Sequence, residues 1–114
     1  MGSLSKLQPV VRLAIINPTV EGNPEFGRGV ANLCRGVRDI GSLNAAAKRM
    51  GMAYSKAWRI VKETEATLGI QLLNRDGAHG STLTEEGAEL LDAYDALVER
   101  LQKKAETDFQ AKAK

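Results

Sequence analysis

Side chains that can bind phosphates and base edges gather in one short stretch of the sequence. They are Tyr54, Ser55, Lys56, Arg59 and Lys62. Lysine and arginine neutralise phosphates, arginine can also bind a guanine edge through two hydrogen bonds, and serine and tyrosine hydroxyls can donate to either group. With the apolar residues of the same stretch turned inward, this mixture indicates a helix that recognises double-stranded DNA. A solvated basic helix face is the alternative interpretation.

This stretch occupies the second helix of a helix-turn-helix pattern. Ser42 is suited to cap a first helix over 43–50, Gly51 provides a turn, and the second helix is expected from Ala53 or Tyr54 to Leu68. Small residues at positions 46 and 47 let the two helices cross closely. Because the second helix of such a unit enters the major groove, the spacing favours DNA binding. Ser42 is counted among the expected DNA contacts.

A polar turn follows the second helix. Extended pieces at 70–74 and 81–83 flank Arg75 to Gly80, which predicts a hairpin. Arg75 and His79 at its edge are expected to contact the DNA backbone or minor groove, as the wing of a winged helix does. A plain connector with an exposed arginine is the alternative.

The last part of the chain has the pattern of one long helix. Thr84 is suited to cap it, and Glu85 and Glu86 suit the positive end of its dipole. Its apolar residues step by four, three and four, which is coiled-coil spacing over about two heptads. We therefore expect homodimerisation through this helix, over 84–108, with a frayed tail after Thr107 and a flexible end at 109–114. The predicted contacts are Leu90, Tyr94, Leu97 and Leu101.

The first part of the chain precedes this unit. Residues 1–6 are expected to be flexible, and the alternating apolar pattern from Leu7 to Asn17 predicts a strand. Turn residues at 17–18 and 21–24 reverse the chain, and a short return strand can follow near Phe26. Residues 29–40 then carry the stripe of an amphipathic helix. The predicted fold is mainly α (α+β): a winged helix-turn-helix domain at 7–83 with an N-terminal strand, a wing and a long C-terminal helix.

Charge is distributed unevenly along the chain. The 114 residues have a net charge of only +2, from 16 basic and 14 acidic residues. Residues 27–83 hold nine basic and four acidic side chains, whereas residues 84–114 hold five and eight. A basic centre is therefore followed by an acidic helix, and the centre is the expected place for an anionic partner.

Several classes of protein are excluded by composition. A single cysteine, Cys34, cannot form an internal disulfide, and one histidine is too few for a zinc site. Cys34 is expected to be a buried thiol. Trp58 is expected to be a partly buried packing residue, and a ring turned toward the DNA is the alternative. No apolar run reaches the roughly 20 residues of a membrane span. We expect a cytoplasmic protein without membrane contact, cofactor or enzymatic activity, since no catalytic constellation is present.

Several runs of residues resemble the DNA-binding domain of the molybdate-responsive ModE-type regulators. They are Phe26-Gly27-Arg28-Gly29, Gly41-Ser42-Leu43, Ala45-Ala46-Ala47-Lys48, Met52-Ala53-Tyr54-Ser55-Lys56-Ala57-Trp58 and Leu83-Thr84, with Leu33, Gly87, Leu90, Leu91 and Tyr94. A looser resemblance to the LysR-type winged helix is carried by Leu68-Gly69, Leu72-Leu73, Arg75, Leu83-Thr84 and Gly87.

The resemblance implies a winged helix-turn-helix transcriptional regulator that dimerises through its terminal helix and binds a two-fold-related DNA site. The chain ends where the molybdate-binding domains of the ModE type would begin, so no small-molecule effector is expected to bind within it. A protein-interaction module that kept this architecture without binding DNA is the alternative function.

Overall fold

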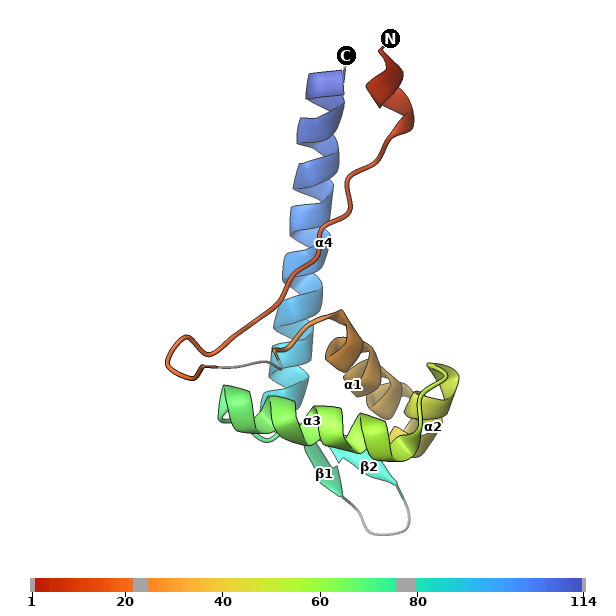
Figure 1. Ribbon diagram of the computed structural model, residues 1–114, viewed down its shortest axis with the longest axis vertical. Coiled ribbons are helices and arrows are strands. Elements are labelled where there is room, and N and C mark those ends of the chain that lie inside the picture. Colours follow the sequence, from red (N-terminus) through yellow and green to blue (C-terminus); the bar gives the residue numbers. More distant parts are fainter. Residues whose placement is uncertain (1, 22–24, 76–79, 114) are drawn as a thin grey trace.

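The protein is an elongated, mostly helical molecule in which one long helix rises from a smaller helical head (Figure 1). The structure is a computed structural model and describes residues 2–21, 25–75 and 80–113. Its longest dimension is 57 Å. The element order is η1 (Ser3–Lys6), α1 (Arg28–Ile40), α2 (Leu43–Arg49), α3 (Tyr54–Leu68), β1 (Leu73–Arg75), β2 (Ser81–Leu83) and α4 (Glu85–Ala113).

Helices α1, α2 and α3 pack around small side chains. Ala46, Ala47, Ala57 and Val61 are fully buried between them. A Cβ added at Gly36 of α1 would lie 2.6 Å from the Cβ of Ala46, so a glycine is required where α1 and α2 cross. The predicted helix-turn-helix unit is confirmed, and its small residues are what allow the close crossing.

The ends of these helices follow the predicted capping chemistry. The Ser42 hydroxyl accepts a hydrogen bond of 3.1 Å from the amide of Ala45 at the start of α2. Gly41 ends α1 and Gly69 ends α3, both in the left-handed conformation. Gly51 in the turn also has positive φ, +69°.

The predicted hairpin is present as a two-stranded antiparallel sheet. Leu73 pairs with Leu83 and Arg75 with Ser81. The Ser81 amide donates to the carbonyl of Gly41 (3.0 Å), which joins the hairpin to the α1–α2 junction. Four helices with this hairpin make the fold a winged helix-turn-helix, as expected from the sequence.

Helix α4 is longer than the sequence pattern predicted. Thr84 caps it through a hydrogen bond from the Gly87 amide (2.9 Å), as expected. The prediction of a frayed tail after Thr107 is wrong, because the helix continues to Ala113. This final part packs against the start of the chain, where η1 replaces the flexible start expected at 1–6.

The N-terminal strand is the main point at which the prediction fails. Residues 7–17, which we call the N-terminal strap, are extended and lie along α4 (Figure 1). Their only strand-like contact among the described residues is a bridge between Ile15 and Phe26. A side chain of α4 takes the place of a partner strand, since the Gln102 amide accepts from the Val11 amide (2.9 Å) and donates to the Pro9 carbonyl (2.8 Å).

Candidate nucleic-acid interface

The first turn of α3 presents an exposed, cationic helix end. Tyr54, Ser55 and Lys56 are all exposed there. Ala53 at the N-cap provides no side-chain hydrogen bond, and no acidic residue lies in the first turn. The backbone amides of Ser55 and Lys56 therefore keep their capacity to donate, and the helix dipole adds to the charge of Lys56. This end of the helix is suited to an anion such as a phosphate.

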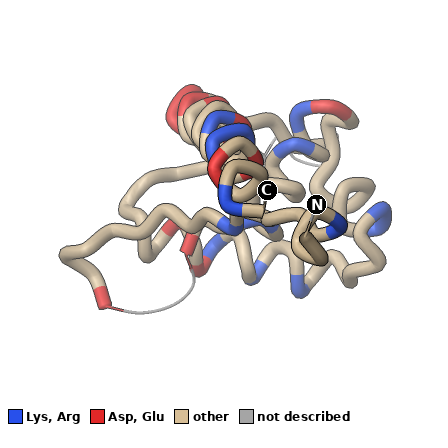
Figure 2. Tube along the Cα trace, turned by 90° about the horizontal axis from the view of Figure 1, so that it is seen from above, with Lys and Arg blue, Asp and Glu red and all other residues tan. Residues whose placement is uncertain are grey.

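Basic residues without an intervening carboxylate extend from α2 into the middle of α3. Between residues 43 and 62 there are five cations and no acidic residue. Lys48 and Arg49 at the end of α2 are exposed, and neither forms an ion pair with a described residue. The sequence reading missed these two residues, although the charge count along the chain contained the signal. Figure 2 shows the basic positions of α3 along one edge of the molecule, away from α4.

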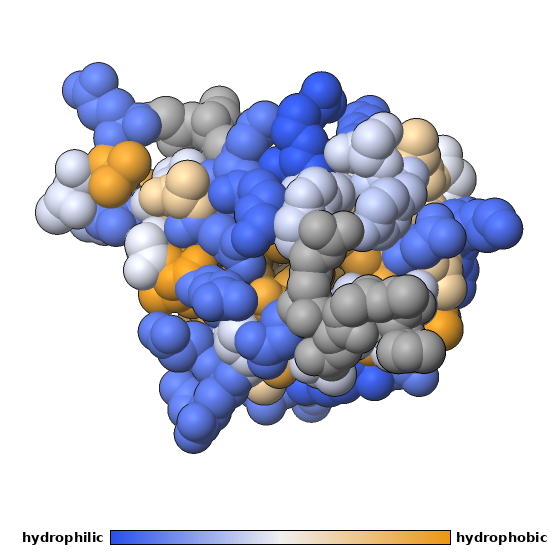
Figure 3. Space-filling model, turned by 90° about the horizontal axis from the view of Figure 1, so that it is seen from below, coloured by the Kyte–Doolittle hydropathy of each residue, from blue (hydrophilic) through white to orange (hydrophobic). Residues whose placement is uncertain are grey.

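The surface around α3 and the hairpin is mainly hydrophilic (Figure 3). Small apolar patches interrupt it. Met50 contributes to the apolar exposure at the turn between α2 and α3, since 36% of its surface is accessible. Polar contact with a charged partner is therefore better supported on this face than burial of a large apolar area.

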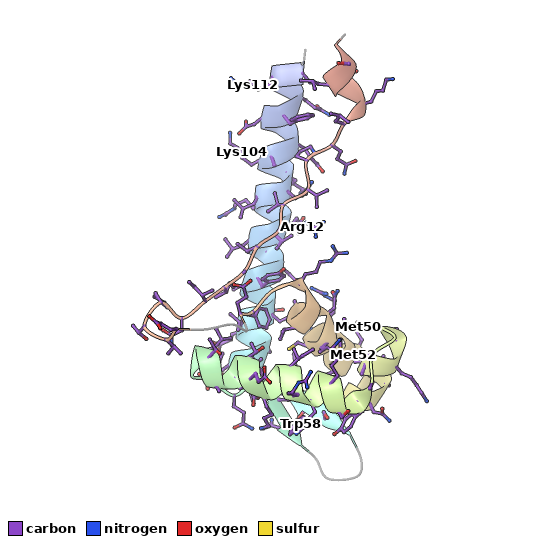
Figure 4. All side chains as sticks on the ribbon, in the orientation of Figure 1. Arg12, Met50, Met52, Trp58, Lys104 and Lys112 are labelled. Atoms are coloured by element: carbon purple, nitrogen blue, oxygen red, sulfur yellow. The ribbon has the colours of Figure 1, made fainter. Side chains whose placement is uncertain are left out.

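Two of the predicted DNA contacts are already held by acidic neighbours. Arg59 lies 3.7 Å from the Glu63 carboxylate in a pair that is exposed on both sides. The Lys62 ammonium lies 3.2 Å from Glu65 and 4.7 Å from the centre of the Trp58 ring. Trp58 is partly buried against the core, as expected, on the side of α3 that faces the hairpin (Figure 4). Lys62 is consequently less available to a phosphate than Lys56.

Glu65 connects α3 to the hairpin, and sequence reading did not find it. Its side chain is only 9% exposed. One carboxylate oxygen accepts hydrogen bonds from the amides of Leu72 (2.7 Å) and Leu73 (3.2 Å), where the chain enters β1. A carboxylate on a helix has no local pattern that marks it as a bridge to a segment seven residues later. Through this contact α3 and the hairpin keep a fixed separation.

The remaining predicted DNA contacts differ in how far the structure describes them. Ser42 is half-buried, and its hydroxyl is already engaged as the cap of α2. Arg75 ends β1, but its side chain and the whole of His79 lie outside the described residues. Both therefore stay predictions.

The predicted dimerisation residues divide between two faces of α4. Leu97 and Leu101 are each 40% exposed, and Leu90 is half-buried. The structure does not agree with the prediction that Tyr94 contacts a second copy, because this residue is 5% exposed and belongs to the core of its own chain. Its ring packs edge-on against Phe26, with centroids 5.4 Å apart, and its hydroxyl donates to the Leu13 carbonyl (3.2 Å).

Ion pairs fix α4 relative to the helix-turn-helix unit. Arg35 of α1 pairs with Asp95, and Arg38 pairs with Asp92 at 2.7 Å. Two basic residues of the middle segment are therefore used inside the molecule. Within residues 27–75, most of the positive charge that remains available to a partner lies on α2 and α3.

Cys34 is fully buried, and burial raises the pKa of its thiol to about 12. This agrees with the expected structural role. Within the described residues there is no group of three or more potential metal ligands. Over the same ranges, no helix is long and apolar enough to span a membrane.

Comparison with known proteins identifies relatives of this geometry. Residues 33–88 match the family described as "Bacterial regulatory helix-turn-helix protein, lysR family". The chain is 40% identical over 75 residues to "HTH-type transcriptional regulator CrgA" of Neisseria meningitidis, in serogroup C strain 8013 and in serogroup B strain ATCC BAA-335 / MC58. That alignment covers 66% of this chain and 24% of each relative, so the chain spans about a quarter of their length.

A solved structure has a similar fold. Its title is "Crystal structure of CbnR_DBD-DNA complex", and the two chains superpose with a TM-score of 0.61 at 26% identity. The superposition covers 73% of this chain and 94% of the other. Of the two resemblances expected from the sequence, the LysR-type one is confirmed by these matches.

Proposed function

Because residues 33–88 match the bacterial LysR-type helix-turn-helix family, we propose that this chain binds double-stranded DNA in a sequence-specific way, as a homodimer, and regulates transcription. The observation that carries the proposal is a run of five cations without a carboxylate over residues 43–62, from the start of α2 to the middle of α3, on the unit that enters the major groove.

The exposed side chains of this unit have separate roles in the proposed complex. The Lys56 ammonium and the backbone amides of Ser55 and Lys56 bind phosphate, and the hydroxyls of Tyr54 and Ser55 donate to phosphates or base edges. Arg59 reads a base edge in the major groove once it leaves its weak, exposed pair with Glu63. Lys48 and Arg49 add backbone contacts at the end of α2.

The hairpin is proposed as a second contact, with Arg75 and His79 toward the DNA and Ser42 at the start of α2. Lys62 contributes to the positive field more than to direct contact, because Glu65 and Trp58 already hold its ammonium.

Homodimerisation through α4 is supported by apolar and charged residues of that helix. Leu97 and Leu101 are exposed along one stripe. Residues 85–99 carry six acidic and no basic side chains, whereas residues 100–113 carry four basic and two acidic ones. Two copies of α4 packed antiparallel would place the acidic half of each against the basic half of the other. The two domains would then bind a two-fold-related site.

The finer likeness to ModE-type regulators stays a prediction.

The DNA-binding proposal is tested by selecting duplexes from a random-sequence pool and measuring affinity against salt. The Lys56→Ala/Arg59→Ala double variant should bind the selected duplex at least tenfold more weakly. Loss of the Lys56 phosphate contact should lower the slope of log affinity against log salt by about 0.9, and loss of the Arg59 base contact should remove discrimination against the wrong base. A fall of about 1.8 in the slope would contradict base reading by Arg59 and place it on a phosphate.

A matched control removes the same charge elsewhere. Lys6→Ala/Arg28→Ala removes two exposed cations, one on η1 and one at the start of α1, both outside α2, α3 and α4. It should leave the affinity within about twofold of the native chain. Failure to retain any duplex at low salt, or equal loss in both double variants, would contradict the proposal and favour the protein-interaction module.

A further inference from the structure

The N-terminal strap has one hydrogen-bonded edge and one free edge. In an extended chain the N–H and C=O of a residue point to the same edge, and neighbouring residues point to opposite edges. The odd-numbered residues are bonded: Pro9 and Val11 to Gln102, Leu13 to Tyr94, and Ile15 to Phe26 in both directions.

The even-numbered residues form the free edge. Among the described residues, none donates to or accepts from the backbone N–H and C=O groups of positions 8, 10, 12, 14 and 16. The only proline within this stretch, Pro9, lies on the bonded edge, so its missing N–H does not interrupt the free one. Five consecutive pairing positions are therefore available to another strand.

The side chains of the strap also suit a strand. Val11, Leu13 and Ile15 are half-buried toward the molecule, whereas Val10 is 62% and Ile16 57% exposed. β-Branched residues that alternate in this way are favoured in sheets. An exposed edge of this length is ordinarily a template for pairing, and natural proteins cover or interrupt such edges.

The place of the strap relative to α4 points to its partner. The strap contacts α4 at Tyr94 and Gln102, while the exposed Leu97 and Leu101 lie on the adjoining stripe, roughly a quarter turn round the helix. A two-fold axis that relates two antiparallel α4 helices puts both straps on the same side of the helix pair. Figure 4 shows Arg12, at the middle of the strap, beside α4.

We propose that the straps of two copies pair with each other through their free edges, as an antiparallel two-stranded ribbon across the two-fold axis of the dimer. The inference rests on the homodimer proposed above. It adds an interface outside residues 33–88, the part of the chain that matches the LysR-type family. The alternating sequence pattern of 7–17 then has the partner strand that a single copy does not provide.

The experiment measures amide hydrogen exchange of the full chain by NMR, at a concentration where sedimentation shows the dimer and after dilution to monomer. In the dimer, the amides of Val10, Arg12 and Ala14 should exchange at least about tenfold more slowly than after dilution. A dimer in which these amides exchange equally fast at both concentrations overturns strap pairing and leaves the α4 dimer standing. A chain that stays monomeric at both concentrations overturns strap pairing and the homodimer, while DNA binding is judged separately by the duplex assay.

A pair of substitutions at one exposed site tests the same point. Ala14→Pro removes one N–H from the free edge, and Ala14→Ser keeps it. The proline variant should weaken dimerisation at least about fivefold relative to the serine variant, with helical content unchanged by circular dichroism. Equal dimerisation constants for the two variants would contradict the pairing. The bonded edge is preserved in both, because position 14 makes no hydrogen bond to α4 in the structure.

Discussion

The contact of Glu65 with the start of β1 gives a prediction whose size can be worked out. In Glu65→Ala, the amides of Leu72 and Leu73 lose their acceptor, and both residues are buried, with 0% and 2% exposure. A buried donor without a partner costs about 1–3 kcal/mol. An open groove lined by Lys62, Gln71 and Glu86 reaches Glu65, so water can replace part of the lost acceptor. We therefore expect the cost for each amide to lie near the low end of this range, so that Glu65→Ala lowers the free energy of unfolding by about 2–3 kcal/mol in total.

Two further variants separate the hydrogen bonds from the charge. Glu65→Gln keeps one oxygen that can accept from both amides. Because a neutral acceptor is about half as strong as a charged one, this variant should lower the free energy of unfolding by about 1 kcal/mol. Glu63→Ala is the matched control, because Glu63 lies two residues away, is 54% exposed and makes only a long pair with Arg59. Its effect should stay within about 0.5 kcal/mol.

The assay is urea unfolding followed by circular dichroism, with the slope m compared among the variants. Glu65→Ala should also lower the melting temperature by about 10 °C, at about 4 °C per kcal/mol for a domain of this size. A loss below about 0.5 kcal/mol for Glu65→Ala, or a loss equal to that of Glu63→Ala, would refute the reasoning that this carboxylate holds the hairpin to α3.

Further predictions concern packing and the buried thiol. Gly36→Ala should lower the free energy of unfolding by about 1–3 kcal/mol, because the new Cβ would lie 2.6 Å from the Cβ of Ala46. Gly29→Ala lies in the same helix with open space around its Cβ, so it should raise the free energy of unfolding by about 0.5–1 kcal/mol. Urea unfolding of the two variants tests both values. Cys34 should not react with a thiol reagent at pH 8 in the folded protein and should react fully in urea; fast reaction of the native chain would contradict its burial. Burial raises the pKa of this thiol from 9.0 in the unfolded chain to about 12 in the folded one. The free energy of unfolding should therefore not depend on the thiol below pH 9, and should fall by up to about 1.4 kcal/mol per pH unit between pH 9 and 12. Cys34→Ala should reduce this decline.

The parts of the fold that the sequence predicted well are those that local chemistry determines. Ser42 and Thr84 were expected as caps, and each hydroxyl accepts from an amide three residues later. Gly41 ends α1 with a positive φ, a conformation that few residues other than glycine adopt. These features depend on neighbours within one turn of helix, so a pattern of a few residues is sufficient to specify them.

The features that the sequence did not reveal depend on segments distant in the chain. Tyr94 follows the spacing of the leucines on α4, yet Phe26 and the Leu13 carbonyl bring it into the core. Glu65 was unremarkable among the charged residues of α3, and only the return of the chain at Leu72 gives its carboxylate a role. Helical periodicity specifies which residues share a face but not what covers that face.

The N-terminal strap shows what such a pattern does and does not determine. Its period of two predicted an extended backbone, and in the structure Val11 and Leu13 are half-buried while Val10 is exposed. The prediction was wrong about the partner of the strap. A second strand was expected beside the strap, whereas in the described residues the side chain of Gln102 forms hydrogen bonds to its backbone. A helix side chain can bond only one edge of an extended segment, so the other edge keeps its pairing capacity. The strand pattern is therefore half satisfied in one copy of the chain, and pairing of two straps would satisfy the other half without moving any contact that α4 already makes.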